Sequence, residues 1–227
     1  MLGIVLPALR VSLVSWVLCG IAYPLAVTAT GQALLPFQAG GSLERAPNGT
    51  IVGSLLIGQH WDGTGWFHGR PSATVGTAPN NPSSTVSLPY NAANSGGSNL
   101  GPISKRLAQR LAAERNAVEA AQPELAGRML PADMLTASAS GLDPDISPAD
   151  AALQVPRIAA ARGIAAERIA ALVARNIVGR TLGIFGEPRV NVLRLNLDLS
   201  KTYPAAPLRS SSVRMPPSAA AAARLRA

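Results

Sequence analysis

The sequence predicts an α+β protein that consists of a single N-terminal transmembrane helix followed by one extracytoplasmic α+β domain. Three observations lead to this prediction. A run without Asp, Glu, Lys or Arg extends from Val11 to Leu43, which is longer than the roughly 20 residues that a bilayer-spanning helix needs. Beyond it, apolar residues recur at helical spacing. Other stretches have the length or the alternation of strands.

The expected membrane helix covers residues 11–36. Val, Leu and Ile supply ten of the residues from Val11 to Leu35, and each contributes about −0.3 to −0.6 kcal/mol to insertion near the membrane centre. Pro24 removes one helical hydrogen-bond donor, so we expect one kinked span. Arg10 precedes the span on its short side, and the positive-inside rule therefore places residues 1–10 in the cytoplasm and residues 37–203 outside it.

A cleaved secretory signal is the alternative interpretation of this segment. A signal has an apolar region of roughly 7 to 15 residues followed by small residues, and Val27-Thr28-Ala29 would serve as the cleavage site. Against a signal, the segment is preceded by one basic residue and stays apolar from Ala33 to Phe37. Both interpretations place the rest of the chain outside the cytoplasm.

The charge distribution argues against a nucleic-acid-binding protein, and the cysteine content argues against a disulfide-stabilised one. The net charge of +8 invites a nucleic-acid interpretation, but five basic residues and no acidic one follow Ser200, so the globular part is nearly balanced. Residues 204–227 are basic and rich in Ala, Pro and Ser, as is typical of a disordered extension that contacts anionic lipid or a partner. Cys19 is the only cysteine, so we expect no intramolecular disulfide.

The first half of the domain is predicted to contain a strand, a long loop and a helix. Residues 51–58 form an apolar run between turn signals, which predicts a short buried strand. Residues 77–101 are rich in Pro, Asn, Ser and Gly and predict irregular chain. Pro102 opens a helix that ends near Ala121, with an apolar stripe at Ile103, Leu107 and Leu111.

Two more helices follow, and the first has explicit capping signals. Ser147 caps the helix that Pro148 opens, and Asp150 completes an arrangement resembling a capping box. Pro156 kinks or interrupts this helix and Gly163 ends it. Residues 165–178 then form a second amphipathic helix that ends at a glycine.

Residues 189–199 give the clearest strand pattern of the chain. Alternate positions are occupied by leucine from Leu193 to Leu199, with polar residues between them. The phase of the alternation slips once, at Val192-Leu193. We therefore expect either a β-bulge or a strand that is covered on both faces.

The loop of residues 59–74 holds both histidines and two of the three tryptophans. These rings either staple the loop onto the core or form a recognition surface. His60, Asp62 and His68 could approach a metal, but their spacing matches no established ligand pattern. Phosphate-binding, dinucleotide-binding and nucleophile-elbow motifs are missing from the sequence. The sequence therefore favours an accessory or binding role over an autonomous enzyme.

Five peptides in order resemble the C subunit of the Kdp-type potassium-transporting ATPase, the KdpC family. They are Gly53–Gln59, Phe67–Ala73, Ser95–Gly101, Thr136–Pro144 and Gln154–Arg157. The resemblance covers roughly residues 5 to 200. The segment 77–91 is longer than the family pattern, and the tail after Pro204 falls outside it.

The resemblance implies a non-catalytic subunit of an ATP-driven potassium uptake complex in the bacterial inner membrane. Its partners would be a channel-like potassium-binding subunit, a P-type ATP-hydrolysing subunit and a small single-span peptide. The subunit would stabilise the assembly, raise the ATP affinity of the hydrolysing subunit as a catalytic chaperone, or shape the potassium entrance. No cofactor is expected on the chain alone, with ATP bound only in the complex.

The resemblance also assigns candidate residues. Gln154 matches a glutamine proposed as a nucleotide contact, although the predicted topology puts it on the side without cytoplasmic ATP. The other motif or interface candidates are Gln59, Phe67, Arg70, Pro71, Ser95, Gly96, Gly97, Ser98, Asn99, Ser138, Ser140, Gly141, Asp143, Pro156 and Arg157. The rival class is an anchored or secreted periplasmic binding protein or enzyme built around the two histidines and Asp62.

Overall fold

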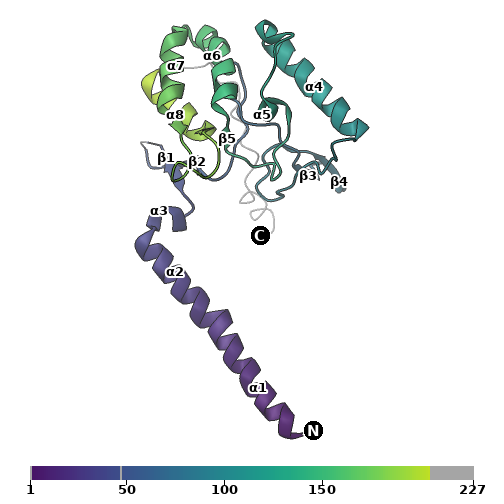
Figure 1. Cartoon of the computed structure of the whole chain (residues 1–227), viewed down its shortest axis with the longest axis vertical. Coiled ribbons are helices and arrows are strands. Elements are labelled where there is room, and N and C mark those ends of the chain that lie inside the picture. The colour runs from purple at the N-terminus through teal and green to yellow at the C-terminus, as the bar shows by residue number, and fades with distance from the viewer. Residues whose placement is uncertain (1, 47, 205–227) are drawn as a thin grey trace. The chain divides into compact units, whose positions relative to one another are not determined.

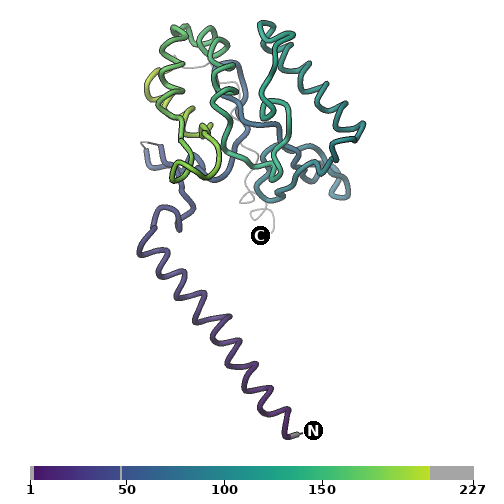
Figure 2. Tube along the Cα trace, in the orientation of Figure 1, coloured from purple at the N-terminus to yellow at the C-terminus, as the bar shows by residue number. Residues whose placement is uncertain are grey.

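The structure is a computed structural model of the whole chain that describes residues 2–46 and 48–204 (Figures 1 and 2). The chain divides into two compact units, Met1–Leu56 and Ile57–Ala227. Of the predicted basic tail, residues 205–227 lie outside the described residues.

The first unit begins with one long helix. α1 (Leu2–Val17), the π-helical turn η1 (Leu18–Ala22) and α2 (Tyr23–Leu34) follow one another without a break (Figure 1). The stretch Gly3–Leu34 is 32 residues long and apolar enough to cross a membrane. At 1.5 Å per residue it measures about 48 Å, against a bilayer core of about 30 Å. The helix starts well before Arg10, so the predicted N-terminal segment is helical too.

Pro24, where a kink was expected, is preceded by a wide turn of the helix. The N–H of Tyr23 donates to the carbonyl of Leu18, five residues earlier. Because the ring of a proline meets the carbonyl four residues before it, the widened turn makes room for Pro24 inside the helix.

The rest of the first unit is a short helix and a hairpin. They are α3 (Pro36–Ala39), β1 (Leu43–Arg45) and β2 (Ile51–Ser54), and the two strands pair antiparallel. The predicted strand at 51–58 is therefore shorter than expected, and it is not buried, since Ile51 and Leu56 are 54% and 62% exposed. The apolar run was a misleading signal of burial, because β2 belongs to a two-stranded hairpin.

The second unit is built around a small antiparallel sheet and three helices. The strands β5 (Asp145–Ile146), β7 (Arg189–Asn191) and β6 (Ile177–Val178) lie in the order β5-β7-β6. The helices α6 (Pro148–Arg162), α7 (Ala166–Arg175) and α8 (Val192–Thr202) pack together beside it (Figure 1). Phe67 of the loop 59–74 and Val190 of β7 join the buried side chains of these helices in the main core, among them Ile158, Ile169, Leu172, Leu195 and Leu199.

A smaller core consists of Leu125, Leu130 and Met134, packed against Val118, Leu135 and Leu153. A second group of elements contains most of this core and the chain beside it. It comprises the hairpin β3 (Val75–Ala78) and β4 (Asn81–Ser87), the helix α4 (Lys105–Ala121), the 3₁₀ turn η2 (Pro123–Leu125) and α5 (Ala132–Leu135). The hairpin corrects the prediction that residues 77–101 are irregular throughout. Serine, threonine and asparagine make up most of β4, so the apolar alternation that marks a strand is missing there.

The capping signals of α6 are confirmed with one correction. The Ser147 hydroxyl accepts from the Asp150 N–H at 3.0 Å, and Gly163 ends the helix in the left-handed conformation with φ of 64°. The reciprocal bond of a capping box comes from another residue, because the Ser147 N–H donates to the Asp133 carboxylate at 2.6 Å. Pro156 lies inside the helix without ending it.

The strand predicted at residues 189–199 is wrong beyond its first three residues. α8 begins at Val192, and the Asn191 side chain caps it by accepting from the Arg194 N–H at 3.0 Å. The buried positions 192, 195, 196 and 199 recur at helical spacing. The slip in the alternation at Val192-Leu193 marks the start of this helix. The helix predicted at 165–178 ends at Arg175, and its last apolar residues form β6.

Candidate functional site

The loop of residues 59–74 is held by side-chain amides that bind the backbone of two consecutive residues. Asn196 of α8 accepts the N–H of Phe67 and donates to its carbonyl, both at 2.9 Å. Gln154 of α6 accepts the N–H of His68 at 2.8 Å and donates to its carbonyl at 3.0 Å. This is the two-bond exchange of an antiparallel strand pair, with an amide in place of each neighbouring strand. The arrangement is termed the amide clamp.

The amide of Gln154 has no hydrogen-bonding capacity left. Besides its two bonds to His68, its oxygen accepts from Arg157 at 2.8 Å and its nitrogen donates to Asp150 at 2.8 Å. A primary amide offers two donors and two lone pairs, and all four are used. The residue is only 3% exposed. A direct nucleotide contact by Gln154 therefore requires these bonds to break.

Arg157 extends the same network to the start of the loop. Its guanidinium donates to the carbonyls of Thr64 at 2.6 Å and Trp66 at 3.0 Å, and to the Gln122 side chain at 3.3 Å. Gln122 in turn donates to the Leu153 carbonyl at 3.0 Å. Burial lowers the pKa of Arg157, and the nearby Asp150 opposes that shift. The bidentate shape of the guanidinium fits several carbonyls that a lysine could not reach together.

Asp150 carries the most strongly perturbed carboxyl of the site. It is 1% exposed, and burial raises its pKa to about 7. The hydrogen bond from Gln154 and the charge of Arg157 pull this pKa down, while the carboxylate of Asp133 pushes it up. The side chain therefore exchanges a proton near neutral pH in the folded protein.

The aromatic residues of the loop serve mainly as staples. Phe67 is fully buried in the main core, and Trp61 and Trp66 pack against that core while partly exposed. The ring centroids of the two tryptophans lie 5.1 Å apart, and the Arg162 guanidinium carbon lies 4.4 Å from the Trp66 ring centroid. Of the two interpretations that the sequence left open, stapling is confirmed for Phe67.

The three candidate metal ligands do not converge. His60 pairs with the Asp62 carboxylate at 2.9 Å, whereas the His68 ring bonds to the Gly63 carbonyl at 2.9 Å. Burial is the main cause that lowers the pKa of His68. Within residues 2–46 and 48–204, no group of three or more His, Cys, Asp or Glu side chains is placed to hold a metal ion.

A second group of motif residues joins the next part of the loop to residues 136–143. Arg70 donates to the Asp143 carboxylate at 3.0 Å and to Thr136 at 3.3 Å. The Pro71 carbonyl accepts from the Ser138 N–H at 3.2 Å. The Tyr90 hydroxyl donates to the Arg70 carbonyl at 2.7 Å. Gln59, near the start of the loop, is half-buried.

The peptide 95–99 packs against residues 138–141. The Ser95 hydroxyl and the Gly96 N–H both donate to the Ser140 carbonyl, at 3.0 and 2.9 Å. A Cβ on Gly97 would lie 2.6 Å from the Ala139 carbonyl oxygen. Gly141 has φ of 68° and leaves no room for a Cβ beside Thr74. These glycines act as conformational devices in this packing.

The remaining candidates lie in different surroundings. Ser98 lines one cavity, and Pro156 lines another together with Arg157. Asn99 adopts a left-handed conformation with φ of 50°. Most candidates thus belong to one of three groups. The first is the amide clamp with its network, the second is the set of loop contacts made by residues 70–71, 95–97 and 138–143, and the third comprises these cavity or turn positions.

Sequence reasoning missed four residues of the networks: Asp150 beyond its capping role, Asn196, Gln122 and Tyr90. Asn196 was placed on the polar face of a predicted strand, and Gln122 and Tyr90 carry no local signal. The one clue to Asn196 in the sequence was its place among leucines that also fit helical spacing, and the structure shows it fully buried there.

The comparisons with known proteins agree with the resemblance. The family model described as K+-transporting ATPase, c chain (KdpC), matches residues 5–201. The chain belongs to this family.

Three relatives are named potassium-transporting ATPase KdpC subunit. That of Bradyrhizobium diazoefficiens is 53% identical over 201 residues, which cover 88% of this chain and 98% of the relative. That of Methylorubrum extorquens is 54% identical over 205 residues, covering 88% of this chain and 100% of the relative. That of Rhodopseudomonas palustris is also 54% identical over 205 residues, covering 90% and 100%.

Proposed function

We propose that the chain is a non-catalytic accessory subunit of an ATP-driven potassium uptake complex and stabilises that complex by docking on a neighbouring subunit. Membership of the KdpC family and the names of its relatives support this role. The apolar helix Gly3–Leu34 supports a position in the membrane. Potassium-binding and ATP-hydrolysing work would then belong to partner subunits.

One observation carries the docking part of the proposal: residues 180–187 form an ordered loop with an apolar tip. Leu182, Ile184 and Phe185 are 84%, 72% and 63% exposed. The base of the loop is closed by Arg180, whose guanidinium donates to both carboxylate oxygens of Glu187 at 2.8 and 2.7 Å. Three large apolar side chains together in water are costly.

The loop is held in shape by bonds within itself. Thr181 and Phe185 exchange backbone hydrogen bonds at 2.8 and 2.9 Å. Leu182, Gly183 and Gly186 have φ of 55°, 76° and 77°, so the tip is folded tightly. A preformed loop loses little entropy on docking, and a few buried apolar residues supply most of the binding energy at protein interfaces. We therefore infer that the loop docks on an apolar surface of a neighbouring subunit.

The docking test replaces Ile184 and Phe185 with serine together in the full chain. We expect recovery of the complex by co-purification to fall at least about tenfold, because each anchor contributes about 1 to 2 kcal/mol. The matched control replaces Ile103 and Met129 with serine, because these two apolar residues lie outside the loop and are 98% and 95% exposed. Normal co-purification of the loop variant contradicts the docking proposal.

The anchor and its orientation have separate tests. We propose that the N-terminus is cytoplasmic and the main domain periplasmic. Arg10 directly precedes the span, and the positive-inside rule places such a basic residue on the cytoplasmic side. Protease added to spheroplasts should then cleave the domain. Cleavage only after the membrane is permeabilised would reverse the orientation. Deletion of residues 11–36 should abolish co-purification with the transporter.

The finer roles implied by the family resemblance remain predictions. The buried, saturated amide of Gln154 favours a structural effect on the complex over a direct contact with ATP. The KM for ATP of complexes that carry Gln154 variants tests an effect on ATP affinity. The KM for potassium of complexes that carry the serine variant of Ile184 and Phe185 tests a role at the potassium entrance. Metal or ligand binding at His60, Asp62 and His68 by the purified chain alone would favour the rival class of periplasmic binding protein or enzyme.

A further inference from the structure

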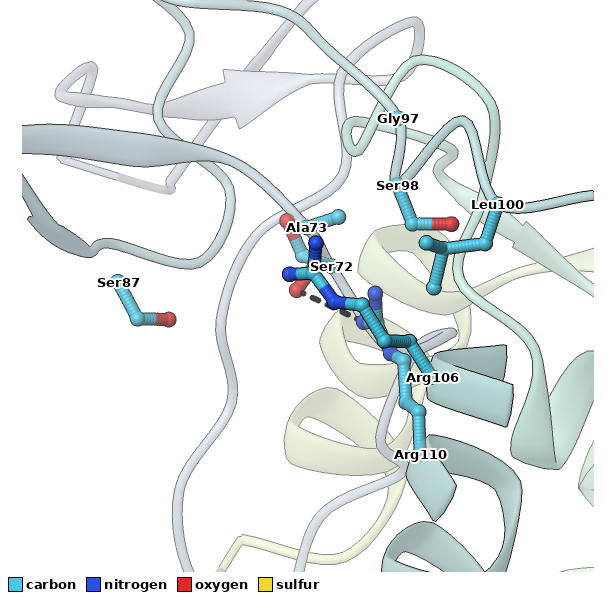
Figure 3. A pocket seen from close by; sticks show the side chains of 8 residues that line it. All are labelled: Ser72, Ala73, Ser87, Gly97, Ser98, Leu100, Arg106 and Arg110. Atoms are coloured by element: carbon cyan, nitrogen blue, oxygen red, sulfur yellow. Dashed lines mark hydrogen bonds between the residues drawn. The ribbon is translucent and has the colours of Figure 1, made fainter. Parts of the chain in front are cut away.

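A basic cavity lies between the start of α4, the hairpin β3–β4 and the peptide 95–99 (Figure 3). Its volume is about 430 Å³, within the roughly 300 to 1,000 Å³ of small-molecule sites. The side chains of Arg106 and Arg110 enter it from α4, Ser98 lines one wall, and Ser87 lies across the opening. It is separate from the amide clamp.

The two arginines lack strong partners within the protein. Arg110 donates to the Ser72 carbonyl at 3.5 Å and lies 3.9 Å from the Glu114 carboxylate, although its side chain is only 24% exposed. The Arg106 side chain has no hydrogen-bond or ion-pair partner among the described residues. Like charges four residues apart on a helix repel each other. The first turn of α4 contains no acidic residue that would offset them.

Two hydroxyls of the cavity are free to donate as well, whereas the Ser72 hydroxyl is already bonded to Thr74 and Gly141. The hydroxyls of Ser87 and Ser98 form no hydrogen bond with the described part of the chain. Guanidinium groups donate only, and a hydroxyl can turn its proton toward an acceptor. The cavity therefore presents convergent donors to a ligand that is rich in acceptor oxygens and negatively charged.

We propose that this cavity binds the phosphate group of a small phosphate ester. The planar fork of a guanidinium matches phosphate oxygens in a bidentate manner, and such charge-assisted bonds are roughly twice as strong as neutral ones. The volume exceeds the space that one phosphate group occupies, so the remainder accommodates the esterified part. A soluble ester and a phospholipid head group share this chemistry. The inference stands independently of the docking role proposed above.

The test measures binding to the full chain in neutral detergent by calorimetry, with glycerol 3-phosphate and inorganic phosphate as probes. We expect Arg106→Gln to weaken glycerol 3-phosphate binding about tenfold, as for the loss of one charge-assisted bond. Folding should persist, because Arg106 contacts no partner in the described chain. Lys105→Gln is the matched control, since it removes the same charge from the adjacent residue outside the cavity.

Two results would overturn the proposal. One is glycerol 3-phosphate binding no tighter than chloride at equal ionic strength. The other is an equal loss in the Lys105 and Arg106 variants, which would indicate unspecific attraction. The source of the phosphate is resolved with chain reconstituted in vesicles of phosphatidylcholine with or without phosphatidylglycerol. Arg106-dependent competition by phosphatidylglycerol identifies a lipid head group, and its absence with binding intact identifies a soluble ester.

Discussion

Gln154 pairs with the backbone of His68 as a neighbouring strand would, accepting its N–H at 2.8 Å and donating to its carbonyl at 3.0 Å. The two residues are 86 positions apart in the chain. Asn196 binds the preceding residue, Phe67, in the same way from α8. Consecutive residues of an extended chain direct their polar groups to opposite sides. The loop is therefore fixed from both edges without belonging to a sheet.

Gln154→Ala should destabilise the chain by about 3 kcal/mol, because it leaves buried groups of His68, Asp150 and Arg157 without a partner. Urea unfolding of the full chain in detergent measures the change. Gln109→Ala is the control, since Gln109 is exposed on α4 and its side chain forms no hydrogen bond with the described residues. Unchanged stability together with a raised KM for ATP in the complex would instead favour a nucleotide contact.

Asn196→Ala should cost about 2 kcal/mol, since the N–H and carbonyl of Phe67 lose buried partners. The double variant with Gln154→Ala should cost less than the sum of the two, by about 1 kcal/mol, because release of one edge of the loop weakens the bonds at the other. A double-mutant cycle from urea unfolding gives the coupling. Strict additivity would show that the two amides act independently.

Asp150 should make the free energy of unfolding depend on pH. Its pKa is raised to about 7 in the folded chain, against about 3.9 when unfolded. The folded state then binds the extra proton between these values, so the stability contributed by this proton is complete below about pH 4 and is lost as the pH rises to about 7. Asp150→Asn, which cannot ionise, should flatten this slope and unfold less readily at pH 8 by at least about 1 kcal/mol.

Urea unfolding at pH 5 and pH 8 measures both quantities. The matched control is Glu167→Gln, at an exposed position in the first turn of α7, which should keep the wild-type slope. An Asp150→Asn variant with that same slope would show that the carboxyl does not hold its proton in the folded chain.

The helices were predictable where periodicity and capping agree. Ser147, Pro148 and Gly163 bound α6 as the sequence indicates, because capping depends on residues close in the chain. Residues 192–199 misled because alternating leucines over so short a stretch fit both a strand and one face of a helix. The hairpin β3–β4 escaped prediction because its strands are mostly polar and exposed.

The amide clamp shows why the site was only partly predictable. The resemblance singled out Gln154 and Arg157, but the groups of the loop that they bind, at His68, Trp66 and Thr64, lie 86 or more positions away along the chain. No local pattern indicates such a contact. Asn196 escaped altogether, because its partner Phe67 lies 129 positions away and its own segment was assigned to a strand.

Gly141→Ala tests whether the packed loops of residues 95–99 and 138–141 need a glycine for space as well as for conformation. The residue has φ of 68°, and an added Cβ would contact the Thr74 side chain and lie 2.7 Å from the Gly96 carbonyl oxygen. Gly163→Ala is the matched control, because Gly163 has φ of 64° with no atom within 4 Å of the added Cβ. Both variants bear the left-handed strain of about 1 to 2 kcal/mol.

We expect Gly141→Ala to cost at least about 1 kcal/mol more than Gly163→Ala in urea unfolding, since overpacking in a filled site typically adds about 1 to 3 kcal/mol. The excess should be accompanied by faster hydrogen exchange at the Gly96 N–H, which donates to the adjacent Ser140 carbonyl at 2.9 Å. Equal costs in the two variants would mean that the loops yield without loss, and that glycine is required there for its backbone conformation alone.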